Sequence, residues 1–185
     1  YTPSNYIFPS KIQKYAEQTH NKGENLTQTG REQGIRRLMS INLLKRLESS
    51  VHSFQLTLTR IKGLIDSTIE AINRFEKYGT ADITMYEAQE SEFDMDDSNT
   101  DYFSVGKKVK IDLADMDYKT WRTELQQDAE VLELLTLMVA DITPEHDSKL
   151  QELLTLLSRK IENPINPDNK KVIIFSAFSD TAEYL

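Results

Sequence analysis

The feature that most constrains this chain is a row of apolar residues between Gly34 and Tyr78. From Leu44 onward they recur at alternating steps of three and four, and no proline interrupts them. That spacing places them on one face of an α-helix. We therefore predict one long helix over residues 31–78, whose stripe contains Leu44, Leu47, Val51, Phe54, Leu58, Ile61, Ile65, Ile72 and Phe75, with only Thr68 as a polar member.

A helix of that length cannot bury its own stripe. At a rise of 1.5 Å per residue it would reach about 65–70 Å, roughly twice the width of a domain of this size. A second stripe with the same spacing follows and predicts a helix over 117–142, broken only by Asp128; its members are Tyr118, Trp121, Leu125, Leu132, Leu135, Val139 and Ile142. We expect a mainly α fold, a long antiparallel helical hairpin or bundle. The alternative is an oligomeric coiled coil, because such repeats also mark chains that pair with a second copy.

Shorter elements flank this hairpin. Ser10 is expected to cap a short helix that ends near Thr19. Thr143 as N-cap and Pro144 at the first helical position predict a third helix over 144–162. Its apolar face contains Leu150, Leu153, Leu154, Leu157 and Ile161.

The segment between the two long helices is strongly acidic. From Thr80 to Asp101 there is no lysine or arginine, and the acids are Asp82, Glu87, Glu90, Glu92, Asp94, Asp96, Asp97 and Asp101. Such a segment repels itself and has little to bury. We predict a mobile acidic loop over 80–115 at the tip of the hairpin, with a short strand or extended segment at Lys107–Leu113.

The character of the chain changes after residue 163. Residues 164–170 are a linker by composition. The run KVIIFSAF from Lys171 to Phe178 predicts a buried parallel strand, and Ser179-Asp180 opens a helix. This strand has no predicted partner, and the chain begins without methionine. We therefore expect a piece of a longer protein, in which 1–163 is a helical insert and 171–185 is the first strand and helix start of a truncated α/β domain.

Composition and charge limit the compartment and the partners. Cysteine is absent, which excludes disulfides and thiolate metal sites and fits an intracellular protein. No signal peptide is recognisable, and the longest mainly apolar run, Val131–Ile142, is too short to span a bilayer. A cytoplasmic protein is the prediction. The net charge is −8, yet between Arg31 and Lys77 nine lysines and arginines stand against five acids, a local charge of +4 that suits a polyanionic partner.

Three blocks resemble a known family. They are RLMSINLLKRLESS at Arg37–Ser50 followed by Phe54, then DSKL at Asp147–Leu150, and KVIIFSAFSDTAEYL at Lys171–Leu185. Their order and spacing are similar to the region of bacterial Swi/Snf-like superfamily II helicases that joins the first motor lobe to the second, C-terminal helicase lobe. The resemblance is specific in those blocks. Residues 80–115 show no matching motif and are included only because they lie between the blocks.

The resemblance implies a helical region between the two RecA-like lobes of a DNA-dependent ATPase that translocates on double-stranded DNA. ATP and magnesium would be bound by the parent protein, an ATP-dependent helicase and hydrolase, because this piece has no phosphate loop, metal box or arginine-finger motif. It therefore predicts no catalytic, cofactor-binding or metal-binding residue here. The implied partners are double-stranded DNA and the protein's own motor lobes, with no membrane; the oligomeric state is open.

The candidate nucleic-acid-binding residues are Arg36, Arg37, Lys45 and Arg46. Cationic side chains near the start of a long helix suit contacts to phosphate groups, or docking against the motor lobes. The competing interpretation is an ordinary solvated helix face, with Lys45 and Glu48 as a weak pair.

Other conspicuous residues have structural interpretations. Ser49-Ser50 is expected to allow close approach of another element or to mark a bend, and Trp121 to anchor the core. The three histidines, His20, His52 and His146, show no metal-ligand spacing. The second functional hypothesis is a non-enzymatic, coiled-coil-like interaction module whose acidic tip recruits a basic partner.

Overall fold

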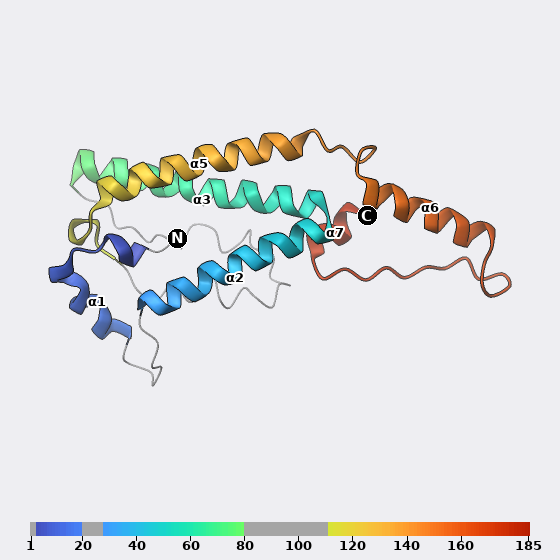
Figure 1. Cartoon of the computed structure of the whole chain (residues 1–185), viewed down its shortest axis with the longest axis horizontal. Helices are drawn as coiled ribbons and strands as arrows, with labels where there is room; N and C mark the ends of the chain where they lie inside the picture. Colours follow the sequence, from blue (N-terminus) through green and yellow to red (C-terminus); the bar gives the residue numbers. More distant parts are fainter. Residues whose placement is uncertain (1–2, 20–27, 80–110) are drawn as a thin grey trace.

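The computed structural model describes residues 3–19, 28–79 and 111–185, and within these ranges the chain is helical. Six α-helices are arranged as Figure 1 shows. They are α1 (Ile12–Thr19), α2 (Gln28–Ser49), α3 (Val51–Tyr78), α5 (Tyr118–Ala140), α6 (Ser148–Glu162) and α7 (Ser179–Tyr184). Three short 3-10 helices, η1 (Pro3–Tyr6), η2 (Pro9–Lys11) and η6 (Leu113–Asp115), complete the described elements.

The predicted single helix over 31–78 is wrong, because it breaks at Ser50. The backbone of Ser50 is extended, with φ −157° and ψ 150°, and its side chain accepts a hydrogen bond from the Ser53 amide. Serine is a favoured N-cap, since its short side chain satisfies an amide that the new helix leaves unpaired. The chain then reverses, so that α2 and α3 run antiparallel (Figure 1). The apolar spacing continues through the break, which is why periodicity alone did not reveal it.

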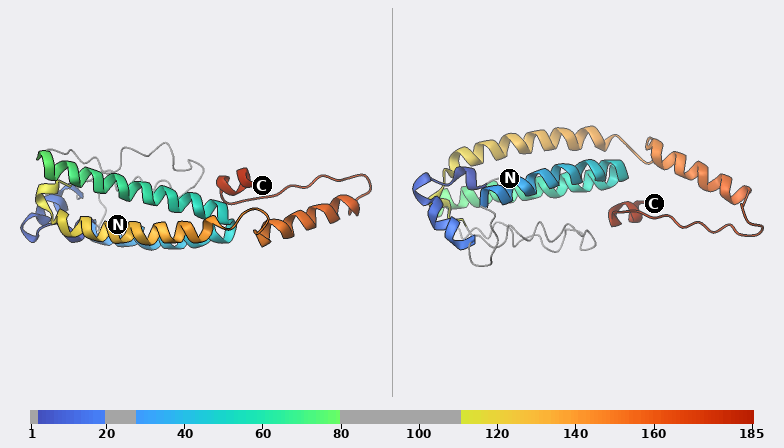
Figure 2. Two further views of the ribbon diagram at one scale, coloured as in Figure 1. Left: turned by 90° about the horizontal axis from the view of Figure 1, so that it is seen from above. Right: turned by 60° about the horizontal axis from the view of Figure 1, so that its bottom comes forward.

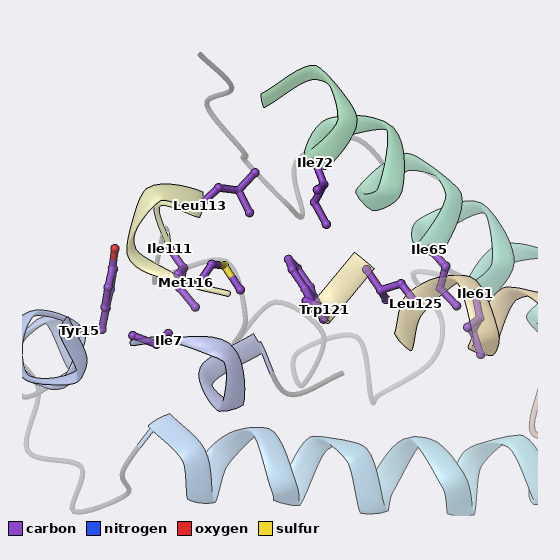
Figure 3. Packing of buried hydrophobic residues seen from close by; sticks show 10 residues of the cluster. All are labelled: Ile7, Tyr15, Ile61, Ile65, Ile72, Ile111, Leu113, Met116, Trp121 and Leu125. Carbon is purple, nitrogen blue, oxygen red and sulfur yellow. The ribbon is translucent and has the colours of Figure 1, made fainter. Parts of the chain in front are cut away.

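The predicted pairing of two long helices is confirmed for α3 and α5, which lie side by side in all views (Figures 1 and 2). Their core residues are Ile61, Ile65 and Ile72 from α3, and Trp121 and Leu125 from α5. Figure 3 shows how these side chains face one another and how Ile7, Tyr15, Ile111, Leu113 and Met116 close the left end of the cluster. Trp121 is almost fully buried, as expected of a core anchor.

The predicted loop over 80–115 is corrected at its end. Residues 80–110, which hold the acidic stretch and the first part of the expected strand at Lys107–Leu113, lie outside the described residues. Ile111 and Leu113 are buried, and η6 follows without any strand. These two apolar side chains gain more from the core than from solvent, since burying one contributes about 1.5–3 kcal/mol.

Helix α5 matches the predicted helix over 117–142, whereas α6 begins later than expected. The carboxylate of Asp147 accepts hydrogen bonds from the amides of Lys149 and Leu150 and is the N-cap of α6. Thr143 and Pro144 instead form a turn, in which the carbonyl of Thr143 accepts from the His146 amide at 2.9 Å. Proline is favoured at the second position of such a turn, so the same dipeptide fits a different element.

The predicted strand at Lys171–Phe178 is not formed. This segment has no regular secondary structure, and Phe175 is 91% exposed. In Figure 1 it runs back from the far end of α6 to α7. A strand exists only through hydrogen bonds to a neighbouring strand, and the described ranges contain none. The helix expected at Ser179 is present as α7. No helix among the described residues has the length and apolar character needed to cross a bilayer.

Candidate functional site

The corner where α2 ends and α3 begins receives the last helix of the chain. Figure 1 shows α7 beside this corner, although the two segments are far apart in the sequence. Asp180 of α7 accepts hydrogen bonds from Arg46 of α2 at 2.7 Å and from Arg60 of α3 at 3.0 Å. Arg60 contacts both carboxylate oxygens, the second at 3.2 Å. We call these three residues the arginine clamp.

The clamp is largely removed from water. The side chains of Arg46 and Asp180 are each 6% exposed, and that of Arg60 is 23% exposed. Charge pairs in such surroundings are screened much less than surface pairs. The guanidinium of Arg46 also lies 4.6 Å from the ring centroid of Phe178, at the start of α7, in a cation–π contact.

Hydroxyl groups form a second layer of contacts at the corner. The hydroxyl of Thr181 lies 2.8 Å from that of Ser49 and 2.9 Å from that of Ser50. Arg46 donates to the Ser53 hydroxyl at 3.2 Å. The expectation that Ser49-Ser50 allows close approach or marks a bend is confirmed, since Ser50 both caps α3 and contacts α7.

The same corner also holds the start of α6. Lys149 donates to the backbone carbonyls of Glu48 and Ser49. Tyr184 of α7 donates to the Asp147 carboxylate at 3.2 Å and stacks on His52, with ring centroids 4.8 Å apart. Burial and the neighbouring Asp147 raise the pKa of Tyr184. Helices α2, α3, α6 and α7 therefore converge on one polar joint.

The structure separates the four candidate nucleic-acid-binding residues. Arg36, Arg37 and Lys45 are exposed on α2, as a phosphate contact or a solvated helix face would both require. Arg46 is buried in the clamp and faces Asp180. The positive charge of Arg46 is therefore paired with Asp180 inside the molecule.

Sequence reasoning missed Arg60 and the pairing role of Asp180. The sequence predicts only that Ser179-Asp180 opens a helix, and Asp180 does lie in the first turn of α7. Once the fold buries Asp180, its carboxylate requires a cation. The sequence contains no indication of which of its cations that would be.

A second polar cluster lies at the opposite end of the bundle. The buried carboxylate of Asp115 contacts Lys14 at 2.5 Å, Tyr15 at 2.8 Å and Lys11 at 3.1 Å. These contacts, that of Lys14 foremost, hold the pKa of Asp115 well below its usual range. The cluster holds α1 and η2 against η6, at the end of the bundle far from the corner. The contacts of Asp115 therefore stabilise the fold.

Among the described residues, no group of three or more His, Cys, Asp or Glu side chains is placed to hold a metal ion. No protein-family model, curated protein or solved structure matches this chain. The resemblance described above therefore stays a prediction.

Proposed function

We propose that residues 1–163 form the helical region between the two motor lobes of an ATP-dependent enzyme that moves along double-stranded DNA, and that residues 171–185 begin the second lobe. In this role the chain sets the geometry between the lobes and forms part of the DNA-facing surface. ATP and magnesium would act in the lobes and not on the residues of this chain.

One observation carries the proposal. The blocks that support the resemblance, Arg37–Ser50 and Lys171–Leu185, lie far apart in the sequence. Arg46 and Asp180 come from these two blocks, lie 134 positions apart and share a hydrogen bond of 2.7 Å. Such a joint is what a connector needs if the start of the second lobe is to move together with the helical region.

The exposed segment Lys171–Phe178 supports the same proposal. It is rich in β-branched and aromatic residues, yet it has no strand partner among the described residues. Its composition suits a strand that is covered on both faces. In a complete second lobe, neighbouring strands would pair with its backbone, and helices on the two faces of the sheet would cover these side chains.

The DNA-contacting part of the proposal rests on Arg36, Arg37 and Lys45. Replacing all three with alanine in the parent protein should weaken DNA binding and DNA-stimulated ATP hydrolysis. Log affinity falls as log salt rises, and each lost phosphate contact makes this fall less steep by about 0.9 in slope. The matched control replaces Lys77, Lys119 and Lys170, which carry the same total charge and are exposed elsewhere. Equal effects of the two variants, or an unchanged salt slope, would refute the DNA contact.

The motor assignment has a separate test in the parent gene. A phosphate loop and a metal box encoded on the amino-terminal side, and an arginine-bearing helicase motif on the carboxyl-terminal side, are expected. A parent gene that encodes neither would overturn the assignment.

A helical interaction module is the second candidate function. It is favoured by the large apolar side chains that remain exposed on α2, α5 and α6, among them Leu44, Leu137 and Leu154. Contiguous exposed apolar surface marks sites of protein association. A parent gene without motor motifs would favour this candidate.

A further inference from the structure

Helix α6 lies outside the core of the molecule. None of its residues is buried, and among the described residues none of them packs on the main core cluster. Figures 1 and 2 show α6 projecting beyond the end of α5, away from the bundle. Packing of an apolar face positions most helices in proteins. The direction of α6 therefore depends on other contacts.

Lys149, in the first turn of α6, attaches this helix to the end of α2. Its amino group donates to the carbonyls of Glu48 and Ser49, the latter at 3.0 Å. The last carbonyls of a helix have no partner within that helix and carry the negative end of its dipole. A lysine placed on them therefore forms a favourable contact between the two helices.

Asp147, the residue before α6, attaches the same helix to α7. One oxygen of its carboxylate accepts from the amides of Lys149 and Leu150, at 3.1 Å each, and caps α6. The other oxygen accepts from the hydroxyl of Tyr184, the last residue of α7, at 3.2 Å. The ring of Tyr184 stacks on His52 in the first turn of α3. With α7 in place, the start of α6 is thus attached both to α2 and, through Tyr184, to α3.

The segment that returns from α6 to α7 is too long to fix the direction of α6. Residues 163–178 join the far end of α6 to α7 and contain neither helix nor strand. They could reach about 50 Å when extended. Helix α6, with 15 residues, is about 22 Å long. A connection with this much slack permits many directions, so the contacts at the corner decide between them.

We propose that α6 is a movable arm whose direction is set by α7. With α7 at the corner, Tyr184 and Lys149 hold the start of α6 at two places, and the arm points away from the bundle. When α7 leaves, Asp147 loses Tyr184, and α6 turns about the irregular residues 141–147 on the single contact of Lys149. The position of the arm thus reports whether α7 is docked. This inference does not rest on the proposed function.

The direction of the arm can be measured as a distance between two spin labels. The chain has no cysteine, so labels can be attached at Gln127→Cys in α5 and Ser158→Cys in α6, both exposed positions. Pulsed electron paramagnetic resonance of the full chain should give one narrow distance distribution. Tyr184→Phe keeps the ring that stacks on His52 and removes the hydroxyl that binds Asp147. The ratio of released to fixed arms should then rise about two- to tenfold, as expected for one lost hydrogen bond.

Tyr78→Phe is the matched control for this measurement. It removes a hydroxyl from an exposed tyrosine at the other end of α3 and should leave the distance distribution unchanged. A broad distribution in the unaltered chain, or equal distributions in the two variants, would overturn the proposal.

The coupling must also act in the opposite direction, because two linked equilibria influence each other by the same factor. Lys149→Met frees α6 from α2 and changes no residue of α7. Hydrogen exchange in residues 178–185 should nevertheless rise about two- to tenfold, whereas Lys170→Met, which removes the same charge from an exposed position, should not change it. Equal exchange in the two variants would contradict the coupling.

A double variant shows whether the coupling passes through Asp147 and Tyr184. In the Tyr184→Phe background this connection is already lost, so Lys149→Met should add nothing to the exchange of residues 178–185. Such non-additivity is the mark of two residues that act through one contact. If Lys149→Met raises exchange by the same factor in both backgrounds, the proposed connection is refuted.

Discussion

Replacing Asp180 with asparagine tests whether the arginine clamp fastens α7 to the corner. Asparagine has nearly the same shape, so the substitution removes the charge that faces Arg46 and Arg60 and leaves the packing in place. Removing one partner of a buried ion pair costs about 3–5 kcal/mol. We expect the lower limit, about 3 kcal/mol, because the amide oxygen of asparagine can still accept a hydrogen bond.

This loss should appear as local opening and not as global unfolding. Helix α7 has six residues and contributes no side chain to the main core cluster. It can detach while α3 and α5 stay packed, since short peripheral elements open before the whole domain does. A change of 3 kcal/mol corresponds to about a 150-fold increase in the open population. Hydrogen exchange followed by mass spectrometry should show this increase for residues 178–185, with exchange in residues 121–132 unchanged.

Two further variants calibrate the result. Glu183→Gln makes the same change of charge on α7 at an exposed position and should leave exchange unaltered. Arg60→Gln removes the more exposed of the two arginines that contact Asp180, while the ion pair between Arg46 and Asp180 remains. It should cost about 1 kcal/mol, about a fivefold increase, because the partial exposure of Arg60 weakens its contribution. If Asp180→Asn exchanges no faster than Glu183→Gln, the clamp is not what holds α7.

Three other predictions concern stability. Ser50→Ala removes the N-cap of α3 and should destabilise the chain by about 1 kcal/mol in urea unfolding. Ser67→Ala changes an exposed serine within α3 and should leave the stability unchanged. Equal urea midpoints for the two variants would exclude the capping role. The lowered pKa of Asp115 means that its contribution to stability is complete above the unfolded-state pKa of about 4 and declines as the pH falls below it. Asp115→Asn should flatten this acid decline, and an unchanged pH profile would contradict the assignment. Burial, followed by Glu124, raises the pKa of Tyr6 to about 12, so stability should fall as the pH rises from about 10 through 12; urea unfolding of Tyr6→Phe should lack this fall, and its persistence would refute the role of Tyr6.

The helical segments followed from the order of the residues because their signals are local. The stripe from Val51 to Phe75 and the stripe from Tyr118 to Val139 each specify a helix face, and two faces of equal period favour pairing. The prediction of Trp121 as a core anchor succeeded for the same reason, since a large aromatic residue within a stripe has no better place. The start of α6 was missed because Pro144 suits both a helix start and a turn, and only the cap at Asp147 separates the two.

The candidate site depended on contacts between distant segments. Nothing near Arg46 distinguishes it from Arg36, Arg37 or Lys45, and all four looked like surface cations. Arg46 became a buried partner only because Ser50 reverses the chain and thereby brings α3 and α7 to the same corner. Its pairing with Asp180 could not be read from composition or spacing.

The sequence by itself determined which segments are helical and which of their faces are apolar, though not every helix boundary, because periodicity acts between residues a few positions apart. The tertiary structure decided that the long stripe is shared by two antiparallel helices, that one of four similar cations is buried, and that α7 packs on the corner. These outcomes depend on the free energy of bringing remote groups together out of water, which no local pattern records.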